Sequence, residues 1–337
     1  MKLLRKILFP IVPLYYFVTW LRNVFYDLGW KSSKSYELPV ICVGNLSVGG
    51  TGKTPTIEYL VRLIKDQYKV AILSRGYKRE TSGFIIANDQ ATAKTIGDEP
   101  FQFYNKFDDV IVSVDANRQR GISKLIEHKQ PDLILLDDAF QHRKVKAGFN
   151  ILLTVYDNLY SDDIVLPTGN LREPRAGAKR ANIILVTKCP NRLSASEKNH
   201  IISKLQPLEG QWVFFSAISY SETICSANER LPLEHLKGKA VTLVTGIANP
   251  LPLIEYLKSK SIDFEHLNFK DHHTFSNSEI AVLREKEVIL TTEKDYVRLQ
   301  SEFTSHSSQL FYLPISFEID EEDEFDAILL SYLSSSL

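Results

Sequence analysis

The sequence predicts an α/β protein with a doubly wound, mostly parallel sheet, a smaller C-terminal α/β domain and an N-terminal amphipathic helix. Short runs rich in Val, Ile and Leu alternate with helix-length segments from Pro39 onward, which is typical of strand–helix units. Most of these runs are continuously apolar, as expected for strands buried on both faces. A second alternation of strand and helix begins near Lys237.

Length and composition narrow the possible classes of protein. The 337 residues exceed one ordinary core and fit two domains. A hydrophobic content of 44% with 24% charged residues is typical of globular chains. The net charge of −1 gives no basic footprint, so we expect no nucleic-acid partner. The three cysteines lie far apart without a CxxC pair, which favours a reducing cytosol over a disulfide framework or a zinc site.

The N-terminal region is unusually apolar and aromatic over residues 6–30. It offers no small-residue cleavage site for a signal peptidase, and Pro10 and Pro13 interrupt a run that is short for a membrane span. Two interpretations remain: a helix packed on the core of the protein, or a helix lying in a bilayer surface. We expect the second, because Tyr, Phe and Trp are so dense here. The basic residues then expected near lipid headgroups are Lys2, Arg5, Lys6, Arg22, Lys31 and Lys34.

The positions of the expected strands and helices divide the chain into three regions. We expect a membrane-associating region at 1–36, a larger domain built on the mostly parallel sheet at 37–220 and a smaller domain at 221–337. The strands expected in the larger domain are 39–44, 69–74, 110–114, 133–137, 150–155, 182–187 and 211–217. Helices are expected at 54–67 and 117–129, and residues 219–238 are the expected connection to the second domain.

A glycine-rich loop, "GNLSVGGTGKTP" at 44–55, follows the first strand and opens a helix at Thr54. The strict phosphate-loop pattern has a glycine where Ser47 stands, yet strand, loop, Gly-Lys-Thr and helix coincide. We therefore favour an NTP site of the P-loop NTPase kind over a glycine turn with an incidental lysine. Lys53 can reach the β- and γ-phosphates, and the Thr54 hydroxyl can ligate Mg²⁺. We expect Gly49, Gly50 and Gly52 to adopt φ/ψ values that side chains forbid, so that their amides turn inward around a phosphate. The expected nucleotide-binding residues are Gly49, Gly50, Thr51, Gly52, Lys53 and Thr54.

Acidic residues at three places could assist phosphoryl transfer. Asp137 and Asp138 end the strand at 133–137, at the edge of the sheet where such proteins hold a metal ion. In "TIGDEP", Asp98 and Glu99 could take a proton from an attacking hydroxyl or hold a water on the metal, although ordinary turn carboxylates are the simpler interpretation. The Asp-His-His run at 271–273 could relay a proton or bind a metal, or could fill the surface or core.

Basic residues crowd a loop rich in Pro and Gly at 166–181. In a chain of near-zero net charge this local cluster indicates an anion on the substrate, with a solvated basic loop as the alternative. Arg75, which follows the second strand, could join the same surface. The basic residues of the loop are Arg172, Arg175, Lys179 and Arg180.

Nine short motifs, in their order along the chain, resemble the motifs of one protein family. These motifs are "VGNLSVGGTGKTP", "SRGY", "GDEP", "LLDDAFQHR", "LPTGNLREP", "VTKCP", "TGIANP", "FKDHHTF" and "TEKDYVRL". From about residue 10 to 330 the chain resembles tetraacyldisaccharide 4′-kinase, the lipid A 4′-kinase. The resemblance implies transfer of the γ-phosphate of ATP, with Mg²⁺, to the 4′-hydroxyl of a tetraacylated glucosamine disaccharide 1-phosphate. It also implies a peripheral or monotopic enzyme at the cytoplasmic face of a Gram-negative inner membrane, and we expect a monomer.

The resemblance also implies roles for individual residues. Asp98 matches the proposed general base, with His272 as its partner and His273 as the alternative. Asp137 and Asp138 match the metal-binding pair, with Glu99 near the metal. Arg172 and His142 match positions that contact substrate. Ala139 replaces the usual glycine of DDGFQH, which is tolerable if the φ of this residue is negative.

Two other functions fit parts of the pattern. Membrane-associated ATPases that act as partner-binding switches share the "GGTGKT" core, but they carry a lysine where Val48 stands here. A P-loop kinase for a soluble metabolite is a third possibility, against which the aromatic N-terminus argues.

The residues that contact the nucleotide base are not predicted. Neither "VTKCP" nor "TTEKD" completes a guanine-binding signature.

Overall fold

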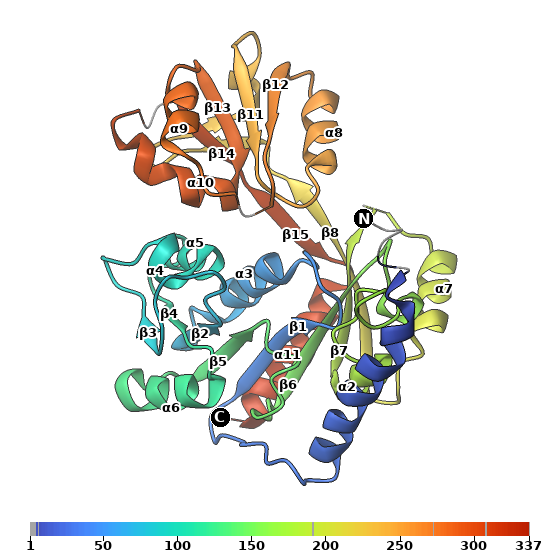
Figure 1. Cartoon of the computed structure of the whole chain (residues 1–337). Helices are drawn as coiled ribbons and strands as arrows, with labels where there is room; N and C mark the ends of the chain where they lie inside the picture. The colour runs from blue at the N-terminus through green and yellow to red at the C-terminus, as the bar shows by residue number, and fades with distance from the viewer. Residues whose placement is uncertain (1–4, 6, 191, 272, 307–308, 337) are drawn as a thin grey trace.

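The molecule has two lobes, each built on its own sheet (Figure 1). The structure is a computed structural model and describes residues 5, 7–190, 192–271, 273–306 and 309–336. The larger sheet has nine strands in the order β15-β8-β7-β6-β1-β5-β2-β4-β3, and the smaller has six in the order β10-β9-β14-β13-β11-β12. In the larger sheet only β3 and β15 run antiparallel to their neighbours, so the sheet is mostly parallel as expected.

The larger sheet places β1 at its centre, between β6 and β5. Its strands are β1 (Val40–Asn45), β2 (Val70–Ser74), β3 (Ile85–Ile86), β4 (Ile111–Val114), β5 (Leu133–Asp137), β6 (Phe149–Val155), β7 (Ile183–Cys189), β8 (Trp212–Tyr220) and β15 (Ile315–Ile319). Its helices include α3 (Lys53–Ile64), α4 (Ala93–Ile96), α5 (Asp98–Lys106), α6 (Arg118–Lys129), α7 (Ala195–Leu205) and α11 (Glu322–Ser336). Every strand expected between 39 and 217 is present, and most of these apolar runs are buried, whereas β8 is buried only over its middle residues.

Helices cover both faces of the larger sheet. One apolar cluster joins the sheet to α3 and α11 through residues such as Leu60 and Phe325, and it includes Phe103 of α5. The opposite cluster joins the sheet to α6 and α7, for example through Leu125 and Leu205. The β-sheet is therefore the middle layer of a three-layer sandwich, which is the doubly wound arrangement.

The smaller lobe repeats the strand–helix pattern. Its strands are β9 (Thr223–Cys225), β10 (Arg230–Pro232), β11 (Val241–Thr245), β12 (Phe264–Asn268), β13 (Val288–Thr292) and β14 (Leu310–Leu313). Its helices are α8 (Leu251–Ser259), α9 (Asn277–Arg284) and α10 (Glu293–Leu299). The expected connection at 219–238 holds the two short strands β9 and β10, which were not predicted.

Two strands link the lobes. β8 leads into the smaller lobe and β15 returns from it, and the two pair antiparallel from Ile315–Tyr220 to Ile319–Ser216 (Figure 1). The expected second domain at 221–337 thus contains β15 and α11, which lie with the larger sheet. Burial of Phe325, Leu329 and Leu333 against that sheet accounts for this return of the chain. The expected start of the second domain at residue 221 stays a prediction.

The N-terminal helix leaves most of its apolar side chains exposed. A 3₁₀ turn (η1, Phe9–Ile11) leads into α2 (Val12–Asp27), whose buried residues are the polar Thr19 and Asn23. Val12 and Tyr15 of α2 pack, partly buried, against the core. The apolar side chains Leu14, Phe17 and Val18 are 64%, 52% and 57% exposed. Among the described residues no helix combines the length and apolarity that crossing a bilayer demands.

Candidate active site

The glycine-rich loop turns between the end of β1 and the start of α3. Gly49 and Gly52 have φ of +113° and +88°, which side chains rarely adopt, so glycine is required at both. Gly50 has no such φ, and a Cβ there would meet nothing closer than the Lys188 Nζ at 4.0 Å. Our expectation of a forbidden conformation at Gly50 was therefore wrong. No side chain caps α3 at Gly52, so the first amides of the helix are available to an anion.

Neighbouring strand ends hold the loop in place. Asn45 Nδ2 donates to Thr51 Oγ1 at 2.7 Å, and Thr187 Oγ1 donates to the Thr51 carbonyl at 2.8 Å. Lys188 Nζ donates to the Gly50 carbonyl at 2.7 Å. The ammonium of Lys53 lies near Lys188, and this charge adds to burial in lowering the pKa of Lys188. Two cations thus face one small loop, an arrangement that suits a polyphosphate.

Asp138 joins this loop to the basic loop at 166–181. Lys53 Nζ lies 3.8 Å from Asp138 Oδ1, and Arg172 donates to both carboxylate oxygens at 2.7 and 3.2 Å. Arg172 also contacts the Asn45 carbonyl at 3.1 Å. Burial opposes ionisation of Asp138, but Lys53 and Arg172 outweigh it and hold its pKa below the usual value. Asp138 is therefore ionised at neutral pH.

Asp137 differs from its neighbour. It is 3% exposed at the end of β5 and accepts a hydrogen bond from Ser74 Oγ at 2.8 Å. Burial, followed by the negative charges of Glu99 and Asp138, raises the pKa of Asp137 to about 7. Glu99 and Asp138 therefore lie near enough to Asp137 for their charges to act on it, whereas the metal-binding role expected of these three residues stays a prediction. Asp138 itself has a φ of +47°, and Ala139 is not among the residues with positive φ, so the alanine is tolerated.

Asp98 is the first residue of α5 and faces the smaller lobe. Gly97 before it has a φ of +95°, and a Cβ there would lie 3.1 Å from the Tyr77 carbonyl. Arg298 of α10 donates to Asp98 Oδ2 from Nε at 3.0 Å and from Nη2 at 2.6 Å. The two residues are 200 positions apart. No local pattern in the sequence predicts this pair.

The Asp-His-His loop follows β12 in the smaller lobe. His272, the expected partner of Asp98, lies outside the described residues. Asp271 lies 3.8 Å from Lys294 Nζ. The His273 ring stacks on Phe269 at 4.7 Å and its Nε2 lies 3.1 Å from the Glu279 carboxylate. His273 is thus engaged within its own lobe, whereas the choice between the two histidines stays a prediction.

The other residues expected to contact substrate are His142, Arg75 and Arg175, and their roles stay predictions. Burial, with the charge of Arg118 next, lowers the pKa of His142 to about 4, so this imidazole is neutral at pH 7. Its Nε2 is buried without a hydrogen-bond partner in the part of the chain that is described. Arg75 is exposed and its charge acts on His142. Arg175 is exposed and donates from Nε to the Asp163 carbonyl at 2.8 Å.

Glu173, next to Arg172, is a buried residue that the sequence did not single out. Its side chain is 0% exposed and accepts from Arg180, from Gln141 Nε2 at 3.0 Å and from Asn23 Nδ2 at 2.7 Å. Asn23 belongs to α2, so this carboxylate ties the N-terminal helix to the loop that carries Arg172. Tyr15 Oη strengthens the same link by donating to the Arg172 carbonyl at 3.0 Å.

The donor set suits Mg²⁺. The oxygen donors available are the Thr54 hydroxyl, Asp137, Asp138 and Glu99, and the crowding that raises the pKa of Asp137 is what a divalent cation would relieve. The described residues contain no cluster of three or more His, Cys, Asp or Glu that could hold a metal.

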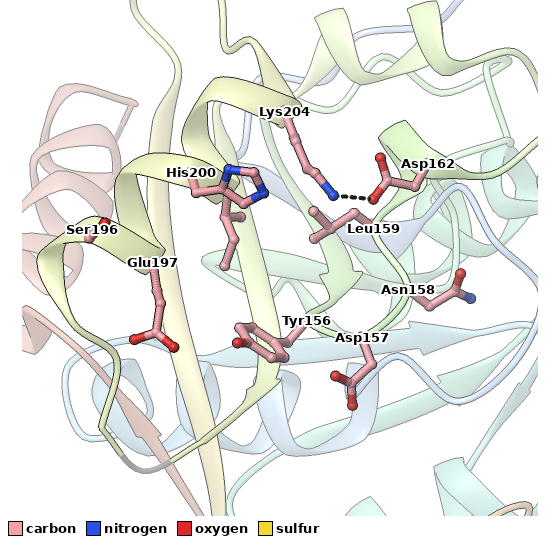
Figure 2. A pocket seen from close by; sticks show the side chains of 10 residues that line it. Tyr156, Asp157, Asn158, Leu159, Asp162, Ser196, Glu197, His200 and Lys204 are labelled. Carbon is pink, nitrogen blue, oxygen red and sulfur yellow. Dashed lines mark hydrogen bonds and ion pairs between the residues drawn. The ribbon is translucent and has the colours of Figure 1, made fainter.

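A separate hollow of about 540 Å³ lies at the end of β6, beside α7. Figure 2 shows Tyr156, Asp157 and Glu197 around it, with Lys204 paired to Asp162 at 2.9 Å. None of the predicted site residues lines it.

A phosphate-binding loop, a lysine at its end and paired carboxylates on the neighbouring strand define a P-loop phosphotransferase. The family profile described as LpxK, tetraacyldisaccharide-1-P 4′-kinase, matches residues 4–334. The chain belongs to this family of lipid A kinases.

Relatives that match over nearly their whole length belong to the same family. The tetraacyldisaccharide 4′-kinase of Flavobacterium johnsoniae is 52% identical, over 100% of this chain and 99% of the relative. That of Bacteroides thetaiotaomicron is 43% identical, over 98% and 93%. The crystal structure of Aquifex aeolicus LpxK in complex with ATP has a TM-score of 0.80 and 31% identity, covering 98% of this chain and 99% of that one. The alternative of a partner-binding ATPase receives no support.

Proposed function

We propose that the chain transfers the γ-phosphate of ATP to the 4′-hydroxyl of tetraacyldisaccharide 1-phosphate, with Asp98 as the general base. The observation that carries this proposal is the convergence of Lys53, Asp138 and Arg172 on a glycine loop at the start of α3. Lys53 and the amides of residues 49–54 would hold the triphosphate. Mg²⁺, held by Thr54 and the carboxylates of Asp137 and Asp138, would neutralise the charge that develops during transfer.

The acceptor hydroxyl must lose a proton as it attacks. Asp98 stands at the N-terminus of α5, adjacent to Glu99 whose charge reaches Asp137, so its carboxylate belongs to the same region as the metal ligands. A base in this position would accept the proton as the oxygen attacks the γ-phosphorus in line. His272 would orient Asp98 from the smaller lobe. Arg172, Arg175 and Arg75 would bind phosphate groups of the lipid, and His142 would contact the substrate as a neutral imidazole.

Turnover of Asp98→Asn tests the base. The variant is expected to lose roughly 10²- to 10⁴-fold in kcat while its KM for ATP changes little, because it removes proton acceptance and keeps the shape of the side chain. Asp108→Asn, an exposed carboxylate just beyond the other end of α5, is the matched control and should turn over normally. Near-normal turnover of Asp98→Asn would show that another group is the base.

We also propose that α2 seats the enzyme on a membrane surface, at the cytoplasmic face of the inner membrane. Helix α2 packs Val12 and Tyr15 on the core and buries the polar Thr19 and Asn23. It nevertheless exposes Leu14, Phe17 and Val18, which are the side chains that a lipid surface would take up. The lipid acceptor, with four acyl chains, resides in such a surface. Of the basic residues expected at headgroups, Arg5 and Arg22 instead donate to the carbonyls of Pro167 and Gln141. Lys2 and Lys6 lie outside the described residues.

A further inference from the structure

Two motifs of the smaller lobe, "TGIANP" and "TEKDYVRL", have no role in the mechanism above. They meet in space: Gly246 comes from the first, and Asp295 and Arg298 come from the second. Asp295 is 0% exposed and accepts from the Gly246 amide at 2.8 Å and from Thr292 Oγ1 at 2.7 Å. A Cβ on Gly246 would lie 2.9 Å from Asp295 Oδ1, so glycine is what permits this approach. The carboxylate of Asp295 is therefore rigidly held.

This anchored carboxylate orients Arg298. Arg298 Nη1 donates to Asp295 Oδ1 at 2.7 Å, while its Nε and Nη2 both donate to Asp98 Oδ2 at 3.0 and 2.6 Å. The Arg298 side chain is only 8% exposed and that of Asp98 is 21% exposed. Because one edge of the guanidinium is fixed within its own lobe, little side-chain freedom remains to be lost when the other edge meets Asp98. Charge-assisted bonds of this kind, shielded from water, are the strong ones.

We propose that Arg298 is a positioning residue that holds the Asp98 carboxylate, from the smaller lobe, in the orientation from which Asp98 accepts the substrate proton. The inference rests on the assignment of Asp98 as base. It gives "TGIANP" and "TEKDYVRL" a shared function, since Gly246 and Asp295 fix the guanidinium. It also makes orientation of the base depend on contact between the lobes, because Asp98 and Arg298 lie on different ones.

A second contact between α5 and α10 provides a control, because it joins the two lobes without contacting Asp98. Lys106 at the end of α5 lies 2.6 Å from Glu293 at the start of α10, so the two helices are joined at both ends. Glu293→Gln removes the charge of this second link and keeps the shape of the side chain. Glu293→Gln weakens the link between lobes without touching Asp98.

The test compares Arg298→Ala, Arg298→Lys and Glu293→Gln for kcat, KM for ATP and Tm. Arg298→Ala is expected to lower kcat roughly 10- to 100-fold with KM for ATP within about twofold, since a misplaced reacting group costs rate rather than nucleotide binding. Arg298→Lys should restore only part of the rate, because one ammonium cannot bind both carboxylates in a fixed fork. Glu293→Gln should keep kcat within about twofold. An equal loss of kcat in Glu293→Gln and Arg298→Ala would overturn the proposal.

A double-variant cycle asks whether Arg298 acts through Asp98. In the Asp98→Asn background, Arg298→Ala should cost little further rate in single-turnover assays, because the group it orients is already inactive. Amide hydrogen exchange at residues 98–102 gives a readout independent of activity: each single variant should raise exchange, and the double variant no more than either. A full additional loss of rate, or unchanged exchange in Arg298→Ala, would contradict the proposal alone. Normal turnover of Asp98→Asn would instead contradict the base assignment, and this inference with it.

Discussion

The exposed apolar side chains of α2 allow the loss of membrane binding in a variant to be calculated and then measured. The perturbation is the triple substitution Leu14→Gln, Phe17→Gln and Val18→Gln. Glutamine is a good helix former, so α2 should persist. Leu14, Phe17 and Val18 belong to none of the buried apolar clusters of the described chain, so we expect Tm to change little.

The expected loss of membrane binding follows from the exposed fractions. Complete burial of such side chains is worth about 1.5–3 kcal/mol each. With 64%, 52% and 57% of the three side chains exposed, lipid can remove roughly half of each from water. The contribution is therefore about 1 kcal/mol per residue and about 3 kcal/mol together, or roughly 10²-fold in the partition coefficient.

Flotation with vesicles of phosphatidylethanolamine and phosphatidylglycerol measures this partitioning. The matched control is Val282→Gln, which removes an apolar side chain that is 53% exposed on α9 of the smaller lobe. The triple variant should lose about two orders of magnitude in partitioning, and the control should bind as the wild type. Partitioning of the triple variant within twofold of wild type, or an equal loss in Val282→Gln, would refute the reasoning.

Three further outcomes concern stability. Gly52→Ala forces a side chain to a φ of +88° and should cost about 1–2 kcal/mol in urea unfolding; an equal cost for Gly50→Ala would contradict the assignment of strain to Gly52. The raised pKa of Asp137, about 7, means that the folded state holds this proton more tightly than the unfolded state, so stability falls as pH rises from about 4 to 7. Asp137→Asn should remove that slope and raise Tm at pH 8 in Mg²⁺-free buffer; a lower Tm there would contradict the shift. Glu173→Ala leaves Arg180 unpaired beside a buried site and should cost about 3–5 kcal/mol, against a smaller loss for Glu173→Gln; a loss below about 1 kcal/mol would contradict it.

Local signals explain what the sequence predicted well. The glycine loop, the strand before it and the helix after it are adjacent in the chain, so their meeting needs no knowledge of the fold. Asp137 and Asp138 were found in the same way, because the carboxyl ends of parallel strands meet at one edge of the sheet. The need for glycine at Gly49 and Gly52 was also local, whereas Gly50 adopts an ordinary φ that no sequence pattern indicates.

Contacts between distant segments account for what the sequence did not predict. Arg298 meets Asp98 only because α5 and α10 face each other across two lobes, and a lone arginine in "YVRL" carries no local sign of this. In the sequence Glu173 is a single acidic residue in a basic loop, and nothing local indicates that it is buried. In the structure its carboxylate is buried and accepts hydrogen bonds from Arg180, Gln141 and Asn23. The return of β15 and α11 to the larger sheet likewise depends on burial of Phe325, which periodicity alone does not locate.

The most direct test of phosphoryl transfer to lipid is one assay with purified protein, γ-labelled ATP, Mg²⁺ and tetraacyldisaccharide 1-phosphate in mixed micelles. Wild-type protein is predicted to move the label to the 4′-hydroxyl, and Asp98→Asn to lose nearly all of that transfer while still binding ATP. Label released as inorganic phosphate with none on the lipid would contradict the account.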